Sequence, residues 1–193
     1  MGHAVTRNVS LSTLVGAVHD AEPRLGGVRL VCIDGPAGSG KTTLARRLAV
    51  ALGVPVVHLD DLYGGWSGLD DAGLWPRVER EVLGPLEVGR PGRWQRYDWG
   101  SAAWAEWHDL PVPEVLVLEG CGCAPRAVEG RTSLVVWVDA PADVRLDRGL
   151  ARDGEQMRDE WLRWMGREAV HLAREGTRER ADVLVDGTHE VPA

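Results

Sequence analysis

The chain has 193 residues, 44% of them hydrophobic, and a formal net charge of −7. This length suits a single domain, 1–193, with a substantial core. The acidic balance argues against sequence-independent nucleic-acid binding, and no apolar run approaches the roughly 20 residues of a membrane-spanning helix. We therefore expect a cytoplasmic protein without nucleic-acid or membrane partners; the sequence leaves a homo-oligomer open.

The pattern of apolar residues predicts strands that alternate with helices. Short apolar runs typical of buried parallel strands occur at Val28–Asp34, Val54–Leu59, Val115–Leu118, Leu134–Val138 and Val183–Val185. Segments with helical spacing occur at Leu11–Ala21, Lys41–Leu52, Ala142–Arg152 and Arg158–Glu175. This alternation indicates an α/β domain in which a doubly wound, parallel, five-stranded sheet carries helices on both faces.

Residues 61–112 differ in composition from the rest of the chain. Glycine and proline gather there, together with six of the nine tryptophans: Trp66, Trp75, Trp94, Trp99, Trp104 and Trp107. Helices are expected at about Leu74–Val88 and Ser101–His108. We interpret the segment as a tryptophan-rich, partly helical insertion that binds an acceptor, above the carboxyl ends of the strands where ligands bind in such folds.

A glycine-rich segment follows the first expected strand. Residues 35–42, Gly-Pro-Ala-Gly-Ser-Gly-Lys-Thr, match the phosphate-binding pattern G-x-x-x-x-G-K-[ST] in full, between a strand and a helix. Backbone N–H groups of such a loop surround phosphate oxygens, the lysine reaches the β- and γ-phosphates, and the hydroxyl after it is placed to ligate Mg²⁺. The residues expected to hold ATP are Gly35, Ala37, Gly38, Ser39, Gly40, Lys41, Thr42 and Thr43.

Absent motifs narrow the class of nucleotide-binding protein. Lys41 is the only lysine in the chain, so no second lysine is left for the Asn-Lys-x-Asp motif of a guanine-specific GTPase. The Leu-Ser-Gly-Gly-Gln signature of transporter ATPases is also missing, and the chain is short for a ring ATPase. Kinases of small molecules and nucleotides remain.

Carboxylates follow two of the expected strands. Asp60 ends the second strand, where a carboxylate would face the γ-phosphate and either accept a proton from an attacking hydroxyl or help to hold Mg²⁺. Glu119 ends the third strand and is expected to organise Mg²⁺ together with Thr42. Arg148 and Arg152 lie four residues apart on a predicted helix, from which they are expected to close over the triphosphate.

Together these motifs resemble the uridine kinase-like family of phosphate-loop kinases. The resemblance rests on Asp60-x-x-Tyr63, Tyr97-Asp98-Trp99, Glu119-Gly120 and the passage from Trp137 to Asp153. It implies that Asp60 is the catalytic base, that Tyr63 lines the acceptor pocket, and that Tyr97 and Asp98 contact the acceptor. It also implies a lid over 145–160 whose arginines embrace ATP. The sequence departs from the family after Asp98, where Gly100-Ser101-Ala102 stands in place of a frequent histidine.

The acceptor stays open at this point. Arg93, with Arg90 and Arg96, is a candidate for gripping an anionic group beside the aromatic residues. The stripe Met157, Trp161, Trp164 has helical spacing and is interpreted as packing. The sequence predicts an ATP- and Mg²⁺-dependent kinase that phosphorylates a hydroxyl of a nucleoside-like or other small metabolite. The alternatives are a nucleoside monophosphate kinase and a nucleotide-binding regulator that transfers no phosphate.

Overall fold

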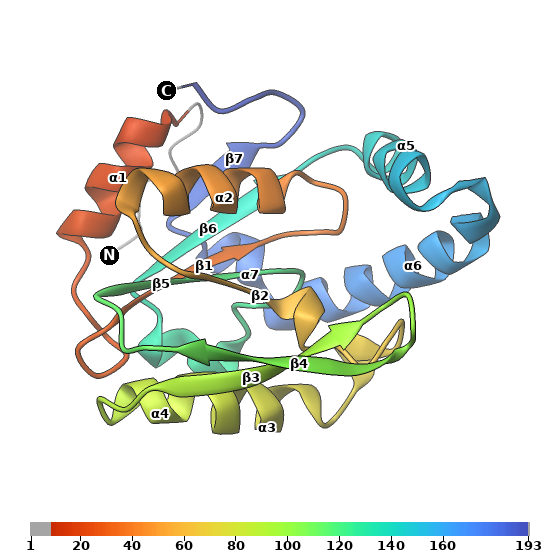
Figure 1. Cartoon of the computed structure of the whole chain (residues 1–193). Coiled ribbons are helices and arrows are strands. Elements are labelled where there is room, and N and C mark those ends of the chain that lie inside the picture. Colours follow the sequence, from red (N-terminus) through yellow and green to blue (C-terminus); the bar gives the residue numbers. More distant parts are fainter. Residues whose placement is uncertain (1–8, 193) are drawn as a thin grey trace.

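The computed structural model describes residues 9–192. Its central sheet has five strands in the spatial order β2–β5–β1–β6–β7, and each neighbouring pair is parallel (Figure 1). The strands are β1 (Arg29–Asp34), β2 (Val56–His58), β5 (Val115–Glu119), β6 (Leu134–Asp139) and β7 (Val183–Asp186). The predicted parallel α/β sheet is confirmed. Because β1, β2 and β5 pair in parallel, their carboxyl ends meet at one edge of the sheet.

Both faces of the sheet are covered, because successive side chains of each buried strand point to opposite sides. Val31 and Ile33 belong to the core under α1 (Leu11–Asp20) and α2 (Lys41–Leu52). Leu30 and Cys32 belong to the opposite core, which α6 (Arg158–Glu175) and the 61–112 segment help to close. Figure 1 shows α1 and α2 above the sheet, with α3 (Leu74–Val78) and α4 (Gly84–Glu87) below it. Helices α5 (Ala142–Asp153), α6 (Arg158–Glu175) and α7 (Thr177–Arg180) complete the fold.

The 61–112 segment contains a helical region and a β-hairpin. α3, a π-helical turn at Glu79–Leu83 and α4 follow one another and account for the helix expected at Leu74–Val88. The prediction of a helix at Ser101–His108 is wrong. Ser101 belongs to the hairpin turn, and the rest of the stretch from Ala103 on lies in β4 (Ala103–Leu110), which pairs antiparallel with β3 (Gly92–Asp98).

Cross-strand contacts explain why Ser101–His108 does not form a helix. Trp94 stacks on His108 with ring centroids 5.1 Å apart, and Arg96 Nε donates to Glu106 at 2.6 Å. At the turn, Asp98 accepts hydrogen bonds from Gly100 N and from the Ser101 hydroxyl. Such pairs stabilise a strand through partners that a local helical pattern does not reveal.

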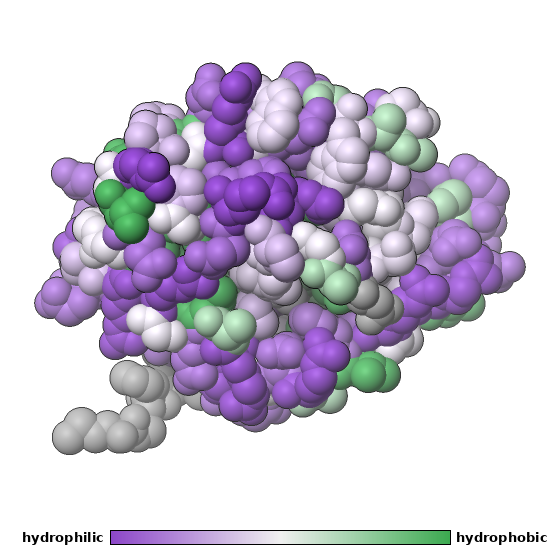
Figure 2. Space-filling model, turned by 90° about the horizontal axis from the view of Figure 1, so that it is seen from below, coloured by the Kyte–Doolittle hydropathy of each residue, from purple (hydrophilic) through white to green (hydrophobic). Residues whose placement is uncertain are grey.

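The face of the molecule seen from below is largely hydrophilic, with hydrophobic residues in small separate spots (Figure 2). Within residues 9–192, no helix combines the length and the apolar character that crossing a membrane requires. The three cysteines, Cys32, Cys121 and Cys123, are buried and unbridged.

Candidate active site

The glycine-rich loop joins the end of β1 to the start of α2, the context that the motif requires. Gly38 and Gly40 have φ angles of +77° and +100°, which favour glycine. A Cβ atom on Gly38 would lie 2.6 Å from the carbonyl oxygen of Arg145, so the loop packs directly on α5. Gly38, Lys41 and Thr42 line a cavity at the start of α2, where the N-terminal amides of a helix favour phosphate.

Asp34 anchors the base of this loop. Its buried carboxylate accepts hydrogen bonds from the amides of Gly35 at 2.6 Å, Gly122 at 2.7 Å and Ala124 at 3.0 Å. Burial raises the pKa of Asp34, and these three hydrogen bonds oppose that rise. The loop is thus tied to the segment after β5.

Lys41 is buried beside the loop, and its Nζ donates to the Pro36 carbonyl oxygen at 3.0 Å. Burial acts to lower its pKa, but nearby negative charges, led by that of Glu119, more than offset this and raise it. The ammonium group is therefore charged and directed at the loop that would cradle phosphates.

Glu119 connects α2 to β2. One carboxylate oxygen accepts from the Thr42 hydroxyl at 3.2 Å, and the other lies 2.6 Å from His58 Nδ1. The hydrogen bond to Glu119 raises the pKa of His58. The hard oxygen donors of Thr42 and Glu119 suit Mg²⁺, which protein sites bind through one or two such groups together with substrate phosphates. Within residues 9–192 no group of three or more His, Cys, Asp or Glu is arranged to hold a metal ion.

Asp60 lies in the same cavity as Lys41 and Thr42. The cavity has a volume of about 520 Å³ and is open at its mouth, through which solvent reaches the Asp60 carboxyl. Desolvation by the surrounding protein, together with repulsion from Glu119, raises the pKa of Asp60 to about 6. A carboxylate with such a pKa is suited to accept a proton near neutral pH.

An aromatic wall, Tyr63, Trp66, Trp99, Trp161 and Trp164, encloses the far side of this cavity. Trp66 makes edge contacts with the other three indoles, at centroid distances from 5.5 to 6.4 Å. Trp161 and Trp164 are buried on α6, so the predicted packing stripe packs and also lines the cavity. The spacing of the stripe along the helix does not separate these two uses.

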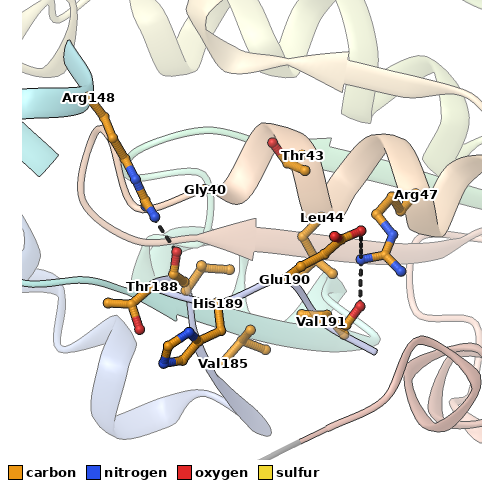
Figure 3. A pocket seen from close by; sticks show the side chains of 12 residues that line it. Gly40, Thr43, Leu44, Arg47, Arg148, Val185, Thr188, His189, Glu190 and Val191 are labelled. Atoms are coloured by element: carbon orange, nitrogen blue, oxygen red, sulfur yellow. Dashed lines mark hydrogen bonds and ion pairs between the residues drawn. The ribbon is translucent and has the colours of Figure 1, made fainter. Parts of the chain in front are cut away.

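The two predicted lid arginines, Arg148 and Arg152, line different cavities. Arg152 lines the cavity with Asp60 and makes two hydrogen bonds to Asp153, at 2.8 and 2.9 Å. Arg148 donates instead to Gly38 O at 3.2 Å and Gly187 O at 2.9 Å, beside a second cavity of about 390 Å³ (Figure 3).

The second cavity lies between the start of α2 and the segment after β7. Thr43 and His189 line it, and Arg47 donates to the Val191 carbonyl oxygen at 2.5 Å (Figure 3). A Cβ atom on Gly187 would lie only 1.8 Å from the Ser39 carbonyl oxygen, so the β7 segment touches the phosphate loop at that point.

Glu168 is a central residue that the sequence motifs do not reveal. Its carboxylate, 1% exposed, pairs with Arg145 of α5 and accepts from Ala37 N of the loop at 2.8 Å. It also accepts from the indole N–H of Trp164 at 3.0 Å. One buried carboxylate thus joins the phosphate loop, α5 and the aromatic wall. The only available signal is its place four residues after Trp164 on the predicted helix.

Three predicted acceptor residues lie outside the lining of the 520 Å³ cavity as described over residues 9–192. Arg93 pairs with Asp109 across the hairpin at 3.2 Å and lies over the Trp107 ring. Asp98 caps the hairpin turn, as described above. Tyr97 packs on Trp99 and Trp104, so it supports the aromatic wall from behind.

A strand, a glycine loop with a buried lysine, and a helix on a parallel sheet define a phosphate-loop nucleotide-binding protein. A family model described as an AAA domain matches residues 31–174, and the chain belongs to this family.

Curated relatives match only segments of the chain. One segment is 46% identical over 59 residues to a cytidylate kinase of Thermus thermophilus, and another is 41% identical over 95 residues to a cytidylate kinase of Granulibacter bethesdensis. The segments cover 30% and 45% of this chain. They span 28% and 36% of those enzymes, about a third of their length.

Solved structures match over nearly the whole chain. A possible uridine kinase from Bacillus stearothermophilus has a TM-score of 0.66 at 19% identity, covering 91% of this chain and 97% of that one. A protein described as a candidate fructose transport system kinase, from Silicibacter sp. TM1040, has a TM-score of 0.59 at 22% identity, covering 91% and 98%. The chain therefore has the fold of the phosphate-loop kinases.

Proposed function

We propose that this protein is an ATP- and Mg²⁺-dependent kinase that moves the γ-phosphate to a hydroxyl group of a small acceptor molecule. The observation that carries the proposal is the position of Asp60. Its carboxyl, with a pKa of about 6, lines the same cavity as Lys41 and Thr42 of the phosphate loop. The groups that would bind the phosphate donor and accept the proton thus line one cavity, as phosphoryl transfer to an alcohol requires.

The loop residues bind and orient the triphosphate. The amides of Gly38, Gly40 and Lys41 and the Lys41 ammonium would hold the β- and γ-phosphates, with the start of α2 adding its positive end. Mg²⁺ bound through Thr42 and Glu119 would neutralise charge between the phosphates. The hydrogen bond from His58 keeps the Glu119 carboxylate oriented toward Thr42.

Asp60 accepts the proton of the attacking hydroxyl in this proposal. At pH 7 most of its carboxyl groups are ionised, because its pKa of about 6 lies below that pH. Arg152 lines the same cavity with an exposed side chain. Its hydrogen bond to Asp153 raises its pKa, and the negative charge of Asp60 adds to this rise. We expect Arg152 to leave Asp153 in part and to neutralise charge that develops on the transferred group.

Two other functions compete with this proposal. A nucleoside monophosphate kinase is suggested by the segments shared with cytidylate kinases. Its acceptor is a phosphate monoester, which calls for uncommitted arginines, whereas Arg93 and Arg96 are paired with Asp109 and Glu106 on the hairpin. The second competing function is that of a regulator that binds nucleotide without transferring phosphate.

An ADP-release assay separates the three. The purified protein is incubated with MgATP and one member of a panel of alcohols, nucleosides and nucleoside monophosphates. Stimulation by a non-phosphorylated alcohol supports the proposal. Stimulation by monophosphates alone supports the nucleotide kinase, and stimulation by no acceptor, with intact MgATP binding, supports the regulator.

A further inference from the structure

Four of the five residues of the aromatic wall use their side-chain hydrogen-bond donors within the protein. The indole N–H of Trp99 donates to Asp60 O at 3.1 Å, and that of Trp161 to Asp153 at 3.0 Å. The Trp164 N–H donates to Glu168, and the Tyr63 hydroxyl donates to Cys121 O at 2.5 Å. Within the wall, Trp66 and Trp99 keep accessible ring surface, whereas Tyr63, Trp161 and Trp164 are buried. Trp161 and Trp164 contact Trp66 and so support the surface that a ligand would meet.

The charges that line the cavity are mostly negative. Four carboxylates, Asp60, Asp61, Glu119 and Asp153, face two cations, Lys41 and Arg152. Both cations are engaged, Lys41 with the phosphate loop and Arg152 with Asp153. The lining therefore has no free cation for a second anionic group besides ATP.

Asp61 is a carboxylate of the cavity that has no role in the proposed phosphoryl transfer. It is half-buried, lines the cavity beside Asp60, and has no hydrogen-bond or ion-pair partner within residues 9–192. Burial raises the pKa of Asp61, and the positive groups that oppose this rise are His58, Arg96 and His108. His58 is bound to Glu119, and Arg96 and His108 are both bound to Glu106 on the hairpin.

A cavity of this kind offers hydrogen-bond acceptors and π faces but few donors. Such a surface favours a ligand that donates hydrogen bonds and carries positive charge, since cations are attracted to indole faces and form charge-assisted hydrogen bonds with carboxylates. It disfavours phosphate monoesters and carboxylates, which need donors in return. It also offers little to the carbonyl groups of a pyrimidine base.

Building on the proposed kinase activity, we propose that the acceptor is an alcohol that carries a protonated amine on a flat apolar body. The body packs against the aromatic wall, the ammonium group binds Asp61, and the hydroxyl reaches Asp60. In the transfer step the acceptor oxygen forms a bond to the γ-phosphorus of ATP, the bond between that phosphorus and the β,γ-bridging oxygen breaks, ADP leaves, and the hydroxyl proton passes to Asp60.

The test uses matched probes on the full chain. Tryptophanol and phenylalaninol are the amines, 3-phenylpropan-1-ol is the neutral counterpart, and cytidine and cytidylate represent a neutral nucleoside and an anion. Calorimetry with Mg²⁺ and a non-hydrolysable ATP analogue measures binding, and ADP release measures transfer. We expect the amines to bind at least roughly tenfold more tightly than the other probes, as one charge-assisted contact allows.

A pair of variants assigns this preference to the cavity. Asp61→Asn removes the free carboxylate and should abolish the preference for amines, while binding of 3-phenylpropan-1-ol stays unchanged. Asp109→Asn makes the same change on the exposed outer side of the hairpin and should leave the preference intact. Equal or tighter binding of cytidylate or of the neutral probes overturns the inference, and so does a preference that survives in Asp61→Asn.

The inference and the kinase proposal fail in different ways. If the amines bind in an Asp61-dependent manner but no alcohol stimulates ADP release, the kinase proposal fails and the ligand class stands. If a neutral or phosphorylated acceptor drives ADP release and the amines bind no more tightly, the ligand class fails and phosphoryl transfer stands.

Discussion

Replacing Glu168 by glutamine should destabilise the protein well beyond an ordinary surface change. The substitution keeps the shape of the side chain but removes the charge that faces Arg145, and the two side chains are only 1% and 12% exposed. Breaking a buried ion pair from one side costs about 3–5 kcal/mol. Arg145 would keep its hydrogen bonds to Ala140 O at 3.1 Å and Ala37 O at 3.2 Å, which favours the lower end of that range.

The assay is unfolding in urea followed by tryptophan fluorescence, together with thermal unfolding. For a chain of this length about 3 kcal/mol corresponds to a fall in Tm of roughly 6–12 °C. Glu160→Gln is the matched control, because Glu160 lies on the same helix in an exposed pair with Arg163; such pairs contribute at most about 1 kcal/mol. MgATP binding should also weaken in Glu168→Gln, since Ala37 of the loop loses a charged partner. If the two variants unfold within about 0.5 kcal/mol of each other, Glu168 does not hold these elements together and the reasoning is refuted.

Three further predictions concern the site. The kcat/KM for the acceptor should fall as pH drops through about 6, to about a tenth of its plateau near pH 5. The reason is that desolvation by the surrounding protein raises the pKa of Asp60 to about 6, and only the ionised form accepts a proton. A profile that is flat down to pH 5 would contradict this. Lys41→Arg should lower phosphoryl transfer by roughly 10²-fold or more, because a planar guanidinium does not replace a buried ammonium. The control Arg46→Lys, at an exposed position on the same helix, should leave transfer unchanged. Transfer at the wild-type rate by Lys41→Arg would refute the role of Lys41. Gly149→Ala should destabilise the protein, because its Cβ would lie 2.4 Å from the Trp161 ring. Gly166→Ala, with open space around it in α6, should stabilise the protein by up to about 1 kcal/mol. Thermal unfolding measures both variants, and equal shifts in Tm would argue against tight packing of α5 on Trp161.

The sequence predicts the phosphate loop and the sheet well because their signals are local. Residues 35–42 are contiguous, and the loop conformation depends on glycines that are visible in the chain. The buried strands appear as apolar runs because both faces of a parallel sheet are covered. Asp60 and Glu119 were found for a related reason, since the carboxyl ends of β2 and β5 meet at the same edge of the sheet.

The remainder of the site depends on contacts between distant segments. Glu168 receives its partners from the phosphate loop and from α5, neither of which is near it in sequence. His58 owes its place in the site to its hydrogen bond with Glu119, which lies on another strand. The expected helix at Ser101–His108 fails for the same reason, because its residues pair with β3 rather than with one another. The aromatic neighbours of Arg93 suggest a place in the acceptor pocket, but Arg93 forms an ion pair with Asp109 across the hairpin.

The role of Asp60 as the proton acceptor is the central claim, and one measurement tests it most directly. Transfer of radiolabelled γ-phosphate from MgATP to an acceptor that stimulates ADP release is compared between the wild-type protein and Asp60→Asn, with MgATP binding measured in parallel. We predict that transfer falls by about 10²–10⁴-fold while the Kd for MgATP changes little. Transfer by Asp60→Asn at the wild-type rate would contradict the account.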